Sequence, residues 1–222
     1  MEIRIQKDRK GLPFFLFSLF AFAGLGLEVI LAFFIEPFFY GKELNDFSTI
    51  ENILHWIFTC VLWATVTYLL IKLSKNKLDF DVFSFKEKIG WQRWLLCCIF
   101  LAVSIVASII SWNGMKVVKE FLYHGWLKFI FQYLYYAFEV GLFLLIIIFA
   151  QSAGEIWFKN EKIPWGGILL ALTWGIAHIF TKGDLLVGIY SSLGGILYGG
   201  VYLICKKNVL LAYPIILLMF IL

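Results

Sequence analysis

The sequence predicts an all-α fold, a polytopic bundle of transmembrane helices. Of its 222 residues, 62% are hydrophobic and only 15% are charged, and the mean hydropathy is +0.87. Soluble domains are roughly half apolar and about one quarter charged, and a soluble fold of this size cannot bury so much apolar surface. Because a bilayer removes that limit, residues 1–222 are expected to form a single integral membrane domain in contact with membrane lipids.

Seven hydrophobic segments are the expected elements of this domain. A helix that crosses the bilayer core needs roughly 20 apolar residues. The segments are Leu12–Ile35, Ile53–Leu73, Trp94–Ser111, Phe129–Ala150, Trp165–Phe180, Leu185–Ile204 and Val209–Leu222. The fifth and seventh are shorter than a straight span requires, and the seventh contains Pro214. The sequence therefore predicts six to seven spans.

The basic residues predict the orientation, because Lys and Arg are retained on the cytoplasmic side of a membrane. With the N-terminus inside, 14 of the 19 basic residues fall in cytoplasmic segments. The other five are Lys42, Lys116, Lys119, Lys128 and Lys182. The predicted topology is therefore N-terminus cytoplasmic and C-terminus outside. The longest linker, around Ser74–Trp91, is expected to hold a short interfacial helix on the cytoplasmic side.

Composition argues against several classes of site. The four cysteines, Cys60, Cys97, Cys98 and Cys205, lie within or at the ends of apolar segments and form no Cys-x-x-Cys pair. They are interpreted as free lipid-facing or core thiols, with no spacing for a disulfide or zinc. No basic stripe interleaved with aromatic residues suggests a nucleic-acid partner, and no cofactor is predicted.

Glycines mark the sixth segment. Gly195 and Gly199 are four residues apart and so share one helix face. Small residues at this spacing let membrane helices approach closely. The pair therefore predicts tight packing against a neighbouring helix.

Ionisable residues within the spans are the candidate functional groups, because such groups are costly in a membrane and face the bundle interior. They are Glu28, His55, Glu139 and His178. A rise of about 1.5 Å per residue places Glu28, Glu139 and His178 in one layer of the outer half, with His55 nearer the outer surface. The third histidine, His124, falls in an outside linker and is expected to be solvated.

These groups allow several kinds of chemistry. A sheltered Glu139 beside His178 could activate water against a peptide carbonyl, or the two could relay protons. Carboxylates and imidazoles could also bind zinc, but no His-Glu-x-x-His helix is present and no metal is predicted. The simplest alternative is a hydrogen-bonded polar plug that fixes helix packing. Glu155 lies at the inner boundary and is expected to pair with Lys159, four residues later.

The second half of the chain resembles a known family. Leu172-Thr173-Trp174-Gly175-Ile176-Ala177-His178 resembles the second motif of the CAAX-protease and bacteriocin-processing family of intramembrane glutamic peptidases, an aromatic residue followed four residues later by histidine. The resemblance covers roughly residues 138–222 and includes the helix order and topology. It implies a polytopic α-helical fold, catalytic glutamates one helix earlier, and a bacterial plasma membrane location.

The first motif of that family, Glu-Glu-x-x-x-Arg, can be placed in two registers. In one, Glu139 is the second glutamate, Phe138 replaces the first, and Phe143 replaces the arginine. In the other, Glu155 is the second glutamate, preceded by Gly154, and Lys159 replaces the arginine. Depth favours Glu139, because Glu155 and His178 fall near opposite surfaces. The third motif is missing, since the seventh segment contains no histidine.

Three functions therefore remain open. The leading one is a non-catalytic or divergent relative of the family that binds a membrane protein or peptide partner. The second is an active intramembrane peptidase for prenylated or leader peptides, with Glu139 as base, His178 as oxyanion or water-positioning partner, and Glu28 or His55 assisting. The third is a small-molecule or proton-coupled transporter, which is disfavoured because no inverted repeats with broken helices are recognisable.

Overall fold

The structure is a computed structural model that describes residues 10–222, and all regular structure in this range is helical. The basic residues Arg4, Lys7 and Arg9, which the predicted topology places in the cytoplasm, lie outside the described residues. The elements are α2 (Gly11–Ile30), the π-helical turn η2 (Leu31–Ile35), α3 (Glu36–Tyr40), the 3-10 turn η3 (Leu44–Asp46), α4 (Thr49–Leu78), α5 (Trp91–Trp112), α6 (Lys116–Phe158), α7 (Trp165–Leu170), the π-helical turn η4 (Ala171–Gly175), α8 (Ile176–Lys182), α9 (Leu185–Ile204) and α10 (Val209–Ile221).

Five of the helical stretches are long and apolar enough to cross a membrane. They are Gly11–Tyr40, which joins α2 to α3, and the helices α4, α5, α6 and α9. The fifth predicted segment forms the helical run from α7 to α8, and the seventh forms α10, a shorter apolar helix of 13 residues. The chain is therefore a helical membrane protein, as the composition predicts.

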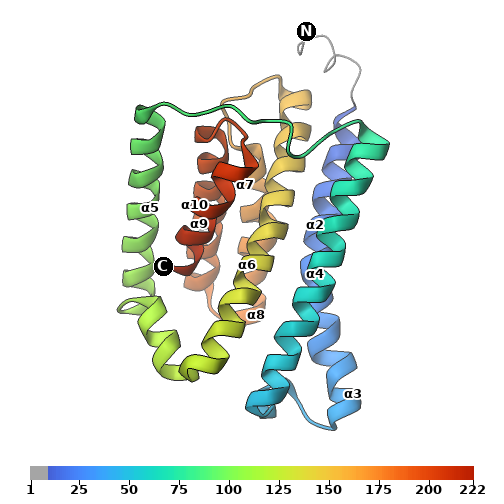
Figure 1. Cartoon of the computed structure of the whole chain (residues 1–222), viewed down its shortest axis with the longest axis vertical. Helices are drawn as coiled ribbons and strands as arrows, with labels where there is room; N and C mark the ends of the chain where they lie inside the picture. The colour runs from blue at the N-terminus through green and yellow to red at the C-terminus, as the bar shows by residue number, and fades with distance from the viewer. Residues whose placement is uncertain (1–9) are drawn as a thin grey trace.

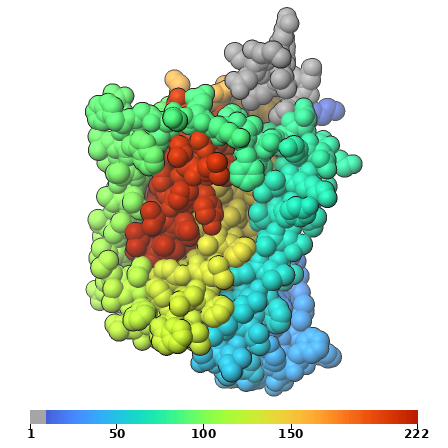
Figure 2. Space-filling model, viewed as in Figure 1, coloured from blue at the N-terminus to red at the C-terminus, as the bar shows by residue number. Residues whose placement is uncertain are grey.

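Helix α6 lies at the centre of the bundle. Helices α2 and α4 pack against it and against each other, while α7 and α10 also contact it. Helix α5 stands at the opposite edge from α2 and α4 and packs mainly against α9 and α10 (Figure 1). In the space-filling view, α10 in red is visible between α5 in green and α6 in yellow (Figure 2).

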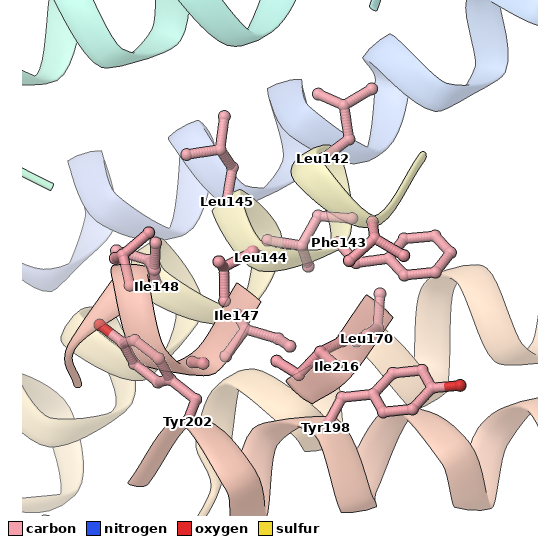
Figure 3. Packing of buried hydrophobic residues seen from close by; sticks show 14 of the residues in the cluster. Leu142, Phe143, Leu144, Leu145, Ile147, Ile148, Leu170, Tyr198, Tyr202 and Ile216 are labelled. Atoms are coloured by element: carbon pink, nitrogen blue, oxygen red, sulfur yellow. The ribbon is translucent and has the colours of Figure 1, made fainter. Parts of the chain in front are cut away.

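The core is built around the middle of α6. Every side chain from Leu142 to Phe149 is at most 3% exposed. Figure 3 shows how these side chains meet Leu170, Ile216 and the rings of Tyr198 and Tyr202 from neighbouring helices. Because this stretch is apolar and buried, it forms a closely packed apolar plug at the middle of α6.

Close helix packing at glycines is confirmed. A Cβ on Gly199 would lie 2.4 Å from the Cα of Gly167, and one on Gly167 would lie 2.8 Å from the carbonyl oxygen of Gly195. A Cβ on Gly166 would lie 2.1 Å from the carbonyl oxygen of Ile147. Helix α7 is thus held between α9 and α6 with its backbone against theirs, which fixes the position of the η4 turn that follows it.

The interfacial helix predicted in the long linker is wrong. Helix α4 continues to Leu78 and ends at Asp79, which has a left-handed backbone (φ 47°). The chain from there to Gly90 contains one turn and no helix. Phe80 and Val82 are buried in the core. Burial of these two side chains favours a non-helical segment, because an extended chain can insert both of them into the core while it crosses one end of the bundle (Figure 1).

Candidate functional site

A histidine between two carboxylates joins α2 and α4 near one end of the bundle, the outer end in the predicted topology. The Nδ1 atom of His55 lies 2.7 Å from Oε2 of Glu36, and its Nε2 atom lies 3.5 Å from Oε1 of Glu28. The hydroxyl of Tyr135 on α6 donates a hydrogen bond of 2.8 Å to Oε1 of Glu28. His55 and Glu36 are each 3% exposed. We call these four residues the outer acid–imidazole cluster.

The π-helical turn η2 explains how one helix supplies both carboxylates. In a regular α-helix, Glu28 and Glu36 would be offset by about 80° around the axis. A π-turn absorbs one extra residue, so the widened Leu31–Ile35 turn brings the two side chains close to one face. Both then reach His55, which lies two turns into α4 after the Ser48 capping box. Glu36 was missed by the sequence analysis because it follows the end of the first apolar run.

Glu139 and His178 both contact Trp174, but neither hydrogen-bonds to the other. The Nε1–H group of Trp174 donates to Oε1 of Glu139 at 3.0 Å. Nδ1 of His178 lies 2.9 Å from the carbonyl oxygen of Trp174, and the two rings are 4.3 Å apart. A carbonyl only accepts, so Nδ1 carries the hydrogen and Nε2 is the free acceptor of the neutral ring. The sequence-predicted pair is therefore connected through a buried indole.

The two groups of residues are linked along α6. Tyr135 and Glu139 are one turn apart on this helix, so they share a face. Glu139 is close enough to Glu28 and to Lys116 to interact with both charges. Glu28, His55 and Glu139 thus belong to one polar layer, and His178 borders it beyond Trp174.

A second group of buried polar residues, centred on Glu120, lies where α6 begins. The predicted outside linker is helical from Lys116 onward, and the helix is broken only at Gly125 (φ 69°, ψ 169°). The break folds the first turns back, and Glu120 accepts hydrogen bonds from Tyr133 at 3.0 Å and Tyr136 at 2.7 Å. Glu120 is 4% exposed. Both Lys116 and Glu120 were missed, because they lie outside the apolar run that marked the segment.

His124 is not solvated as predicted. It lies in the folded-back part of α6, is half-buried, and packs edge-on against Trp56 with ring centroids 5.9 Å apart. The linker expected to expose it is a helix that covers the end of the bundle, which places the ring against α4.

Several buried polar atoms of this part of the bundle have no hydrogen-bond partner in the described protein. They are Oε1 of Glu36, Oγ1 of Thr59, Nε1 of Trp63, Nδ1 of His124 and Oε1 of Gln132. His55, Thr59 and Trp63 are spaced four residues apart, so they form one stripe of α4 that faces the bundle interior. Buried polar groups without partners are uncommon, and each calls for an explanation.

Glu155 belongs to a separate site at the other end of α6. Its expected ion pair with Lys159 is wrong, because Lys159 ends the helix in a left-handed conformation (φ 51°) and leaves the helix face. Glu155 instead pairs with Lys207 at 2.7 Å and accepts a hydrogen bond of 2.8 Å from Gln151. Gln151 in turn accepts from the backbone N–H of Gly166 at 3.1 Å. We call Lys207, Glu155 and Gln151 the inner triad.

Neither cysteines nor acidic residues suggest a metal centre. Among the described residues, no three His, Cys, Asp or Glu side chains are placed to hold a metal ion. Cys60, Cys97 and Cys205 are buried and Cys98 is exposed, and the sulfurs of Cys97 and Cys205 lie 3.9 Å apart.

A groove of about 430 Å³ lies between α5, α9 and the end of α10. Apolar side chains form most of its wall. Ser104, Ser108 and Ser111 of α5 add hydroxyls, Lys116 lies in its wall, and Trp174 contributes to its lining. This volume falls within the roughly 300–1,000 Å³ of typical ligand sites. The indole that contacts Glu139 and His178 is therefore also a wall of the groove.

No family model, curated protein or solved structure matches this chain. The resemblance to the CAAX-protease and bacteriocin-processing family rests on Trp174, His178 and the order of the helices. Of the two glutamates that the expected first motif could use, Glu139 contacts Trp174, whereas Glu155 belongs to the inner triad.

Proposed function

We propose that this chain is a non-catalytic membrane protein, resembling the CAAX-protease and bacteriocin-processing family, which binds a ligand or partner from the membrane in the groove between α5 and α9. One observation carries the proposal: Trp174 both separates Glu139 from His178 and lines the groove. In the proposed topology the N-terminus is cytoplasmic, α7–α8 and α10 add to the five long helices, and the membrane is a bacterial plasma membrane.

The contacts of Glu139 support a binding role over hydrolysis. A general base must reach a water molecule that can attack the substrate carbonyl. One oxygen of Glu139 is occupied by the Trp174 indole, and the residue is 8% exposed. The positions of the family's first glutamate and arginine hold Phe138 and Phe143, which supply neither a second base nor a positive charge.

The position of the groove supports lateral binding. Helix α5 has only Cys97 and Ser104 buried, so this edge of the bundle has no further helix outside it. A ligand can therefore reach the groove from the lipid without crossing the core. Trp174 at its wall would transmit binding to Glu139, and through α6 to the outer acid–imidazole cluster.

A proton relay is the second candidate, and the contacts of His55 favour it. An imidazole that touches Glu36 through one nitrogen and faces Glu28 with the other can pass a proton between two carboxylates. The path is limited to one half of the bundle, because the buried stretch Val140–Ala150 of α6 contains no ionisable group. Proton-gradient-dependent uptake in proteoliposomes that His55→Gln abolishes would establish this function instead.

Cleavage assays test the non-catalytic part of the proposal. Purified protein in liposomes is incubated with libraries of prenylated and leader-type peptides, and products are followed by mass spectrometry. We expect no cleavage by the wild type. Cleavage that Glu139→Gln abolishes would establish the peptidase function and overturn the proposal.

Filling the groove tests the binding part. Gly194 lines the groove, and the atoms nearest to a Cβ there would be the hydroxyl and ring of Tyr198, at 3.5 Å or more. Gly194→Leu should therefore fold and occupy the groove. Gly26→Leu is the matched control, because Gly26 is an exposed glycine of α2 with nothing near its Cβ. Quenching by lipids with brominated chains should be weaker in Gly194→Leu than in Gly26→Leu, and exposed tryptophans such as Trp91 and Trp126 account for the quenching that remains. Equal quenching in both variants would contradict the groove as the binding site.

A further inference from the structure

Lys116 is a buried positive charge at the end of the groove. It is 7% exposed, and its ammonium group donates a hydrogen bond of 2.9 Å to the carbonyl oxygen of Phe220. The same atom lies 4.5 Å from the ring centroid of Phe220 and 4.6 Å from that of Tyr136. Lysine is almost never fully buried unless it is paired, yet Lys116 forms no ion pair with any described carboxylate.

The charges around Lys116 leave its ammonium group available to an anion. Glu120 and Glu139 interact with it at longer range, but their carboxylates are hydrogen-bonded to tyrosines and to Trp174 respectively. A negatively charged group in the groove would therefore meet Lys116 in its wall, whereas neither Glu120 nor Glu139 lines the groove.

The dimensions of the groove indicate what carries that negative charge. Its α5 wall runs from Val103 to Trp112, which is about 14 Å at the rise of an α-helix. A bilayer core is about 30 Å thick, so the groove spans one leaflet. A transmembrane helix would need a face along the whole bundle, whereas the acyl chain of a lipid fits a groove confined to one leaflet.

The polar atoms of the groove are placed for an amphiphile. The hydroxyls of Ser108 and Ser111 lie one turn apart on the face of α5 that lines the groove, on the Lys116 side of Ser104. The hydroxyl of Ser104, farther from Lys116 along α5, already donates a hydrogen bond of 3.0 Å to the carbonyl oxygen of Met219. Hydroxyls and the ammonium group thus gather near one end, and apolar side chains such as Leu193 and Leu197 of α9 line the rest.

We propose that the groove binds an anionic lipid of the outer leaflet, with one acyl chain between α5 and α9 and the phosphate at Lys116. This inference rests on the proposed binding function and names its ligand. Each part of the lipid has a counterpart: apolar side chains for the chain, serine hydroxyls for the glycerol region and lysine for the phosphate. A zwitterionic lipid fits the same groove but brings no net charge to Lys116.

Tryptophan fluorescence gives a direct measurement, because Trp112 and Trp174 line the groove. The protein in nonionic detergent is titrated with phosphatidylglycerol or with phosphatidylcholine, both carrying the same brominated acyl chains. We expect saturable quenching, with an apparent affinity about fivefold higher for phosphatidylglycerol, which is the size of effect that one lysine has on binding to anionic lipid. Trp112→Phe should reduce the quenching amplitude, because it removes one of the two indoles that line the groove.

Variants of Lys116 separate charge from structure. Lys116→Met should bring the affinity for phosphatidylglycerol down to that for phosphatidylcholine, whereas Lys116→Arg should keep the preference. Free inorganic phosphate should not displace the brominated lipid, since it lacks the acyl chain that the groove holds. Displacement by phosphate alone would show that the site recognises the free anion and would overturn the lipid assignment.

The outcomes distinguish the ligand class from the binding function itself. Equal affinities of the wild type for both lipids, with quenching still reduced in Gly194→Leu, would overturn the anionic-lipid inference and leave the groove as a binding site. Unchanged quenching by both lipids in Gly194→Leu would overturn the anionic-lipid inference and the proposed binding function together. A transmembrane peptide that displaces the lipid without any effect of head group would assign the groove to a peptide partner instead. The comparison of head groups uses the wild type alone, so it holds even where a Lys116 variant fails to fold.

Discussion

The two ends of α6 treat buried polar groups in opposite ways. At one end, the inner triad is closed: Glu155 is bound by Lys207 and Gln151, and Gln151 also holds the backbone of Gly166. Toward the other end, buried polar atoms of Glu36, Thr59 and other residues have no partner in the described protein. Between them lies the apolar plug of Leu142–Phe149.

This difference indicates what each end is for. A satisfied network in a low-dielectric interior stabilises and fixes one arrangement, whereas an unsatisfied one is costly. Proteins commonly keep such costly features at functional sites. We therefore infer that the inner triad fastens α6 to α7 and to the turn between α9 and α10, and that the outer half, with its acid–imidazole cluster and groove, carries the function.

The largest expected effect is the loss of the inner ion pair. Lys207→Met leaves the carboxylate of Glu155 buried and without its positive partner, and it should lower the free energy of unfolding by about 3 kcal/mol. Chemical denaturation in detergent, followed by circular dichroism, measures the change. Lys206→Met is the control, because the pair of Lys206 with Glu87 is exposed and should contribute less than about 1 kcal/mol. Similar losses of unfolding free energy in Lys207→Met and Lys206→Met would contradict the view that the inner triad stabilises the bundle more than an exposed ion pair does.

The next effect tests the tight packing at this end. Gly166→Ala forces a Cβ to within 2.1 Å of the Ile147 carbonyl oxygen unless the backbone moves. The variant should lose about 2 kcal/mol of unfolding free energy through overpacking. Gly141→Ala on α6 has an open Cβ position and should gain up to about 1 kcal/mol from helix propensity. Equal values for the two alanine variants would mean that α7 does not pack closely on α6.

In the outer half, removal of a polar atom should stabilise the protein. Thr59→Val keeps the side-chain shape and eliminates a buried hydroxyl that has no partner in the described protein, so the free energy of unfolding should rise by about 1 kcal/mol. Thr65→Val is the matched control on the same helix, where the hydroxyl is exposed and donates to Val61. Destabilisation by Thr59→Val would show that its hydroxyl is satisfied and would weaken the contrast between the two ends.

The smallest effect concerns the linker outside the spans. The hydrogen bond from Lys206 holds the pKa of Glu87 below its ordinary value. A carboxylate with a lowered pKa stabilises the fold above its ordinary pKa, and this contribution disappears as the pH falls through the lowered value. The wild type should therefore melt slightly higher than Lys206→Met at neutral pH and equally in strong acid. Lys88→Met, which changes a neighbouring exposed lysine, should show no such pH dependence.

Much of the architecture follows from the sequence, because apolar length is a strong signal in membranes. The seven segments all form helices, and Gly195 and Gly199 meet α7 as their spacing predicts. The helix predicted in the linker is wrong because Phe80 and Val82 are buried by contacts with distant parts of the chain, which local sequence does not reveal. A run of apolar residues also says little about where a helix begins or ends. Helix α6 begins at Lys116, well before the apolar run that predicted it.

The site was only partly predictable. Glu28, His55, Glu139 and His178 stand out as ionisable residues in apolar runs, and the structure places them in or beside one layer. Glu36 lies just past such a run, and only the π-turn before it turns it toward His55. The true partner of Glu155 is 52 residues away in the chain, which no local spacing can reveal.

The most direct test of the account is the shift in melting temperature that a brominated or native anionic lipid causes in three proteins. A ligand that binds only the folded state raises the melting temperature with its concentration. We predict a lipid-dependent rise in the wild type, the same rise from a lower starting temperature in Lys207→Met, and none in Gly194→Leu despite a near-normal starting temperature. A rise that survives in Gly194→Leu, or that disappears in Lys207→Met, would contradict the division of α6 into a fastening end and a binding end.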